Sequence, residues 1–185
     1  MRITVKIGLI FAAIWIAVRM IPFLMGNSFV QITPFVMMNI LCVLLAIAIG
    51  LYLHKKNTKE DDNNLLGDIK NGMSAGLPYT MVVSLFLYFY YGKIDPAFNA
   101  HKISEFSVGL KKDMANPISF QKIKDSNPEF EVKTRKEIYD SLMQGPKSFF
   151  NAGSTMVISM LALLLLSTIY SILVSVVFRR LIFRN

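Results

Sequence analysis

The sequence predicts an all-α membrane protein, a polytopic four-transmembrane-helix bundle with a small helical extracytoplasmic connection between helices 3 and 4. Its 185 residues are 54% hydrophobic and its mean hydropathy is positive, and both values are high for a water-soluble domain. Many basic residues stand at the ends of apolar segments, where such residues orient transmembrane helices. The predicted spans are at about 3–25, 30–53, 72–91 and 155–178.

The first apolar segment is predicted to be a membrane span that is not cleaved. A basic start followed by an apolar run is typical of a signal peptide, but this run is long and Arg19 interrupts it. No small-residue cleavage site follows the run. Gly8 and Ala12 form a pair of small residues four positions apart, which suits close helix packing.

The second and third spans carry small residues at the same spacing of four. Pro34 lies in the first turns of the second span, where a missing N–H costs little. The spacing connects Cys42, Ala46 and Gly50 in the second span. In the third span it connects Gly72, Gly76, Thr80 and Ser84. The end of the third span, at 86–91, is aromatic, which predicts a belt at the membrane interface.

The fourth span is the longest uncharged run. Residues 156–178 form a stretch of 23 residues without a charge, and Arg179 and Arg180 end it. An α-helix needs about 20 apolar residues to cross a hydrocarbon core. One four-residue ladder, broken only by Leu163, contains Thr155, Ser159, Ser167, Ser171 and Ser175. Such a stripe of small residues predicts close packing against another helix.

Residues 92–152 form the only sizeable water-facing segment. Apolar side chains at 98, 103, 106 and 110 predict a short amphipathic helix that ends at a Lys-Lys pair. Thr134 and Glu137 have the spacing of a capping box at the start of a second helix. Gly145-Pro146 is expected to end that helix.

Four spans place both termini on one side of the membrane. The short turn between the first two spans carries no Lys or Arg, whereas the termini and the second connection are basic, so the positive-inside rule predicts cytoplasmic termini. Segment 92–152 carries ten Lys or Arg residues, but eight acids nearly balance them. Its length is also close to the limit at which the rule stops applying.

Arg19 and Asn39 are the intramembrane polar candidates. Arg19 lies about six residues from the outer end of its span, which is roughly 9 Å at about 1.5 Å per residue. In the ordinary interpretation its side chain snorkels to the headgroups or bonds to carbonyls and polar groups such as Gln31, Thr33 or Asn39. In the functional interpretation it is an anion-contacting or gating charge inside the bundle. The predicted spans contain no acid, which weakens an ion-coupled transporter.

The sequence supports no catalytic, cofactor or metal site. Cys42 is the single cysteine, so an internal disulfide and a cysteine-based zinc site are excluded. His54 and His101 are predicted on opposite sides of the membrane, and neither has a cluster at ligand spacing. There is no G-x-S-x-G elbow and no phosphate-binding glycine motif. The net charge of +8 is not arranged as an aromatic-interleaved basic patch, so nucleic acid is not an expected partner.

The run at 90–98, Tyr-Tyr-Gly-Lys-Ile-Asp-Pro-Ala-Phe, follows a span that begins with Gly72 and Gly76. With four spans and a long third connection, this layout resembles a bacterial family catalogued as domain of unknown function 4199, found largely in Bacteroidota. The resemblance covers the whole chain in layout. It implies a small bacterial inner-membrane protein with a periplasmic loop, and it brings no catalytic residues.

The sequence therefore favours a non-enzymatic membrane module whose segment 92–152 contacts a protein partner or a second copy of the chain. The alternative is a subunit of a small oligomeric transporter or channel. In that case Arg19, Asn39 and the Ser/Thr ladders would line a polar path. Four helices rarely enclose a pathway alone, so the alternative requires oligomerisation.

Overall fold

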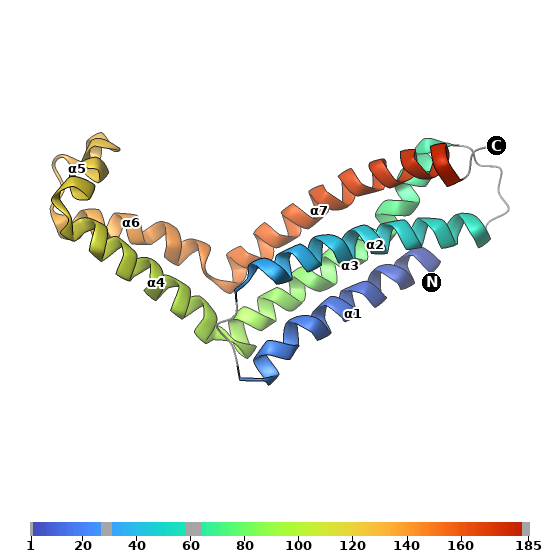
Figure 1. The fold of residues 1–185 in the computed structure, drawn as a ribbon, viewed down its shortest axis with the longest axis horizontal. Helices are drawn as coiled ribbons and strands as arrows, with labels where there is room; N and C mark the ends of the chain where they lie inside the picture. Colours follow the sequence, from blue (N-terminus) through green and yellow to red (C-terminus); the bar gives the residue numbers. More distant parts are fainter. Residues whose placement is uncertain (1, 27–30, 58–63, 183–185) are drawn as a thin grey trace. The chain divides into compact units, whose positions relative to one another are not determined.

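The computed structural model of the chain describes residues 2–26, 31–57 and 64–182. These residues are almost entirely helical and contain no β-strand, which confirms the all-α prediction. In chain order the elements are α1 (Ile3–Leu24), α2 (Thr33–Asn57), α3 (Leu65–Phe89), the π-helical turn η1 (Tyr90–Ile94), α4 (Pro96–Ala115), α5 (Pro117–Asp125), the short η2 (Pro128–Phe130), α6 (Arg135–Phe149), α7 (Ala152–Val177) and η3 (Phe178–Ile182) (Figure 1).

The chain divides into two compact units. The first contains Met1–Tyr88 and Met156–Asn185, in which α1, α2, α3 and α7 lie side by side (Figure 1). The start of α1 and the end of α7 lie at the same end of this unit. All four helices are long and apolar enough to cross a membrane, which confirms the predicted number of spans.

The outward surface of the first unit is apolar. Every one of the four helices exposes large aliphatic or thioether side chains, including Ile14, Leu41, Met81 and Leu165. A helix that faced water on that side would carry charged or polar residues there. The four apolar helices therefore indicate a multi-pass membrane protein.

Three of the spans begin or end outside their predicted limits; one of them is the fourth, which begins at Ala152 rather than near residue 155. The second helix continues to Asn57, and the third begins at Leu65 rather than near residue 72. The predicted start followed hydropathy, because residues 64–71 are mostly polar. The helix starts earlier because Asp68 and Gly72 both lie on its buried face. The predicted turn at residues 27 and 28 lies outside the described residues.

Small residues set the distances between the helices of the first unit. A Cβ atom added to Gly76 would lie 2.8 Å from Cβ of Ser167, and one added to Gly72 would lie 3.1 Å from Cβ of Ser171. A Cβ atom on Gly8 would overlap the backbone carbonyl of Ala75. Helix α3 is therefore in close contact with α7 on one side and with α1 on another.

The second unit, Phe89–Thr155, has a small core of its own. Helices α4, α5 and α6 and the turn η2 fold together, so the segment holds three helices rather than the two predicted. The buried side chains at its centre are Leu110, Met114, Phe130, Ile138 and Met143. Around them pack Ile103, Phe120, Ile123, Tyr139 and Leu142.

Two predicted helix ends in this unit are wrong. Helix α4 passes the Lys-Lys pair and ends at Ala115, because Met114 in that last turn is a core residue. Helix α6 continues through Pro146 to Phe149. The proline removes one N–H donor, but its own carbonyl accepts a hydrogen bond from the Phe150 N–H at 2.8 Å, so the next turn still closes.

The predicted aromatic belt is only partly at the surface. Tyr88 and Phe89 are exposed, whereas Tyr90 and Tyr91 are buried. In the second unit the Tyr90 hydroxyl donates to the Asp95 carboxylate at 3.4 Å, and the Tyr91 ring lies 5.3 Å from that of Phe98. These two tyrosines therefore pack against the start of α4 instead of lying at the surface.

Candidate functional site

The small-residue ladders of the third and fourth spans meet in the structure. Besides the Gly72 and Gly76 contacts, the hydroxyls of Thr80 and Ser167 lie 3.4 Å apart. Ser171 satisfies its own hydroxyl by donating to the Ser167 carbonyl at 2.7 Å. Ser84 and Ser175 are buried on the same two helices, and Ser159 is half-buried. Gly72, Gly76 and Thr80 of α3 therefore form a helix-packing seam with Ser167 and Ser171 of α7.

Arg19 lies inside the bundle. It follows Thr4, Gly8, Ala12 and Trp15 along the buried face of α1, and only 1% of its surface is exposed. Its guanidinium carbon lies 4.8 Å from the centre of the Phe35 ring on α2. The side chain therefore does not snorkel to the bundle surface, because the rotation of α1 directs it toward α2.

Hydrogen bonds connect α1, α2 and α3 near this arginine. The Trp15 indole N–H donates to the Phe35 carbonyl at 3.0 Å. One turn further along α2, the Tyr79 hydroxyl from α3 donates to both the side-chain and the backbone oxygen of Asn39. In an apolar surrounding such bonds between helices hold polar groups that would otherwise lack partners.

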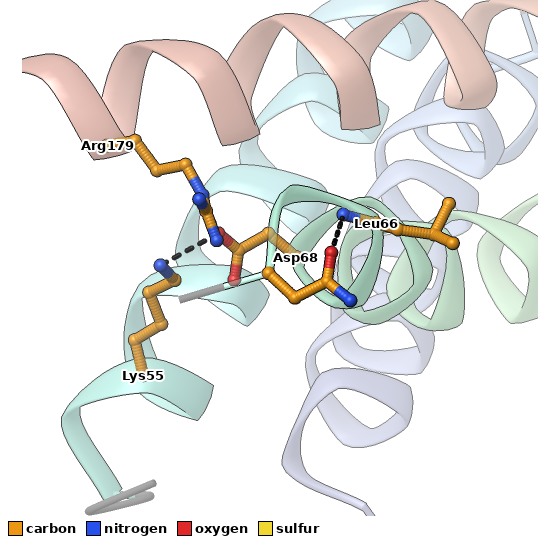
Figure 2. A network of polar contacts seen from close by, with 5 residues as sticks. Lys55, Leu66, Asp68 and Arg179 are labelled. Carbon is orange, nitrogen blue, oxygen red and sulfur yellow. Dashed lines mark hydrogen bonds and ion pairs between the residues drawn. The ribbon is translucent and has the colours of Figure 1, made fainter. Parts of the chain in front are cut away.

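A buried ionic cluster lies where α2 ends and α3 begins. Asp68, which is 4% exposed, accepts from Lys55 Nζ at 2.8 Å and from Arg179 Nε at 2.7 Å, both at its Oδ2 atom. Figure 2 shows the two cations approaching the Asp68 carboxylate from separate helices. One carboxylate thus connects α2, α3 and the end of the fourth span.

Sequence reasoning missed this cluster. The sequence predicts a third span that begins near residue 72 and contains no acid; the early start of α3 brings Asp68 into that helix and corrects this expectation. The three charges are far apart in sequence, and a single aspartate in a polar segment carries no signal of which cations it meets. The only available hint was the group of apolar residues around it, Leu65, Leu66 and Ile69, which predicts an early helix.

The second unit contains an open depression between α4 and α6. Its volume is about 350 Å³, and its lining consists of Lys111, Met114, Ala115, Arg135, Lys136 and Tyr139. Three of these six residues are cations and none is an acid. The depression can therefore receive an anionic group.

No metal centre forms within the described residues. In the ranges 2–26, 31–57 and 64–182, no three His, Cys, Asp or Glu side chains gather in a way that could hold a metal ion. His54 belongs to the first unit and His101 to the second, where His101 pairs with Glu105 at 3.2 Å.

Comparison with known proteins gives a match to a protein family. No curated protein and no solved structure matches this chain. A family model described as "Protein of unknown function (DUF4199)" matches residues 6–180, which include the second unit and nearly all of the four long helices. That match covers far more than half of the sequence and confirms the resemblance seen in the layout of the spans. The chain therefore belongs to the DUF4199 family.

Proposed function

We propose that this protein is a non-enzymatic module of the bacterial inner membrane. In this proposal the four-helix bundle anchors the helical unit Phe89–Thr155 on the periplasmic side. There the unit binds a protein partner or a second copy of the chain. The observation that carries the proposal is that this unit has its own buried core, so it offers a defined surface and not merely a connection between spans.

The contacts of the bundle support an anchoring role. Polar side chains inside it bond from helix to helix, as Tyr79 does to Asn39 and Asp68 does to Lys55 and Arg179. Aliphatic residues such as Val43, Ile47 and Val83 fill the space around them and are fully buried. Such packing stabilises the relative positions of the spans.

The surface of the second unit carries apolar side chains that the fold does not use. Val132 is 90% exposed and Ile118 is 71% exposed. Single exposed apolar residues are common, but two such exposures in a segment this short suit contact with a protein.

Site-specific photocrosslinking in cells tests the proposal. A photoreactive amino acid at Ile118 or Val132 should capture one discrete neighbour, identified by mass spectrometry. The same group at Leu161, an exposed residue of α7, is the matched control. Because this position should face lipid, it should give only background crosslinking to proteins. Recovery of the uncrosslinked monomer alone from both positions would count against the proposal.

A second candidate function follows from the position of Arg19. A buried cation inside a bundle suits an anion-contacting role in an oligomeric transporter or channel. In proteoliposomes, anion flux that Arg19→Ala abolishes would favour this alternative. Flux that is the same in the variant and the wild type would exclude a pathway through Arg19.

A further inference from the structure

The basic depression of the second unit is lined by three cations and no acid. Some cations elsewhere in the unit pair with nearby acids: Lys102 lies 2.6 Å from Glu105, and Lys133 lies 3.3 Å from Glu129. Among the described residues, Lys111, Arg135 and Lys136 form no ion pair. The lining of this concave site therefore carries three positive charges and no negative charge.

Aromatic rings hold two of these cations. The Arg135 guanidinium carbon lies 4.5 Å from the centre of the Phe120 ring, and Lys111 Nζ lies 5.9 Å from that of Tyr139. Stacking of the Arg135 guanidinium on the Phe120 ring limits the motion of that side chain but leaves its N–H donors available. Less side-chain entropy is then lost when an anion binds.

The floor of the depression is apolar. Met114 and the ring of Tyr139 belong to the core of the unit, and Ala115 lies beside them. The Tyr139 hydroxyl is 2.8 Å from that of Ser107, so the ring is held in place. A bare phosphate would gain nothing from such a floor. A peptide with both acidic and apolar side chains would use the floor and the cations together, and Tyr, Met and Arg are enriched where proteins meet.

We propose that this depression binds an acidic segment of a partner polypeptide, with one apolar side chain of the segment on Met114 and Tyr139 and its carboxylates near the three cations. This inference rests on the proposed function and names the chemistry of the partner. The charge complementarity also predicts that binding weakens as ionic strength rises, because these contacts are exposed.

Binding of a labelled random copolymer of glutamate and tyrosine to the full chain in zwitterionic nanodiscs tests this inference. The variant Lys111→Gln/Lys136→Gln should bind the copolymer about threefold to tenfold more weakly, as expected for two exposed charge contacts. The matched control, Lys112→Gln/Lys147→Gln, removes the same charge from the same two helices outside the depression. It should stay within about twofold of the wild type. Both variants should retain the unfolding midpoint of the wild type.

Four results would overturn the inference. These are no binding of the copolymer, equal loss in both double variants, equal affinity for polyglutamate without tyrosine, and preference for vesicles containing phosphatidylglycerol over the copolymer. The last result would assign the site to lipid headgroups. A fifth result separates this inference from the proposed function: if photocrosslinking at Val132 captures its neighbour with undiminished yield in the Lys111→Gln/Lys136→Gln variant, this inference fails while the proposed function stands.

Discussion

At the scale of single residues, the absence of a Cβ atom at a glycine allows two spans to approach closely. Ala75 on α3 lies between two glycines, Gly8 of α1 and Gly50 of α2. A Cβ atom on Gly50 would come closest to the Ala75 methyl group, at 3.1 Å, and would lie at ordinary contact distance, 3.6 Å, from the Cα atom of Thr4. A Cβ atom on Gly8 would meet a backbone carbonyl, which cannot rotate away.

The first prediction follows from this difference. Gly8→Ala should destabilise the bundle by about 1–3 kcal/mol, because the two helices must separate to admit the methyl group. The unfolding midpoint in detergent measures the effect. Gly67→Ala is the control: nothing lies within 4 Å of the added atom, and alanine is a better helix former than glycine by up to about 1 kcal/mol. An equal loss in both variants would contradict this account.

Asp68 illustrates what single-residue reasoning could not find. Its neighbours in sequence, Leu66 and Ile69, indicate a helix, but its two cations come from other spans. By contrast, the sequence left two directions open for the Arg19 side chain, outward to the headgroups or into the bundle. In the structure Arg19 lies on the buried face of α1, so the side chain is directed into the bundle. Composition shows which groups are polar, whereas only the packing of the helices shows which of them meet.

The second prediction concerns this carboxylate. Asp68→Asn removes the negative charge and leaves two cations close together in a mostly buried place. It should destabilise the bundle by about 2–3 kcal/mol. This loss is smaller than the usual loss for a fully buried ion pair because Lys55 and Arg179 are partly exposed. Unfolding in mixed micelles measures the loss. Lys55→Gln and Arg179→Gln should also destabilise, whereas their sequence neighbours Lys56→Gln and Arg180→Gln should not. Stability unchanged in Asp68→Asn would refute the bridging role.

At the scale of helices, capping chemistry was predictable and helix lengths were not. The capping box of α6 is confirmed: the Thr134 N–H and hydroxyl both donate to Glu137 Oε2 at 2.8 Å, and the Glu137 N–H donates back to the Thr134 hydroxyl. A cap involves residues three apart, so its signal is local. The ends of α4 and α6 depend on the core of the second unit, which local patterns do not show.

The third prediction is a pH dependence of this cap. The hydrogen bond from the Thr134 backbone N–H, followed by that from its hydroxyl, holds the pKa of Glu137 below its ordinary value of 4.5. The lowered pKa means that the carboxylate stabilises the folded state fully above the ordinary value, and that this contribution is lost as pH falls through the folded value. Amide exchange in the first turn of α6, corrected for intrinsic rates, should therefore accelerate toward about pH 3.

The control for this effect is Glu137→Gln, which cannot titrate at that position. Its first turn should show no comparable acceleration in acid. Glu105 is a second acid in the unit whose pKa is lowered, mainly by its hydrogen bond from Lys102, so a whole-protein melting curve would mix the two. The site-resolved measurement separates them, and the same acid response in Glu137→Gln would contradict the assignment.

At the scale of the whole molecule, the number of spans was the most predictable property. Long uncharged runs such as 156–178 allow hardly any structure except a helix in lipid. The second unit was harder, because a segment with ten cations and eight acids can fold in several ways. Its core contains residues as distant in sequence as Leu110 and Met143, and no local periodicity shows that they share one core.

The last prediction is the orientation of the chain, which the even number of helices and the distribution of basic residues together support. Cys42 is buried, and Cys42→Ala provides a background without cysteine. In that background Lys122→Cys, on the exposed surface of the second unit, should react with a membrane-impermeant maleimide in spheroplasts. Lys56→Cys, exposed at the end of α2, should react only after permeabilisation. The reverse labelling pattern would place the second unit in the cytoplasm, where a periplasmic partner could not reach the depression. Labelling of both positions in intact spheroplasts would contradict a chain with four spans and cytoplasmic ends.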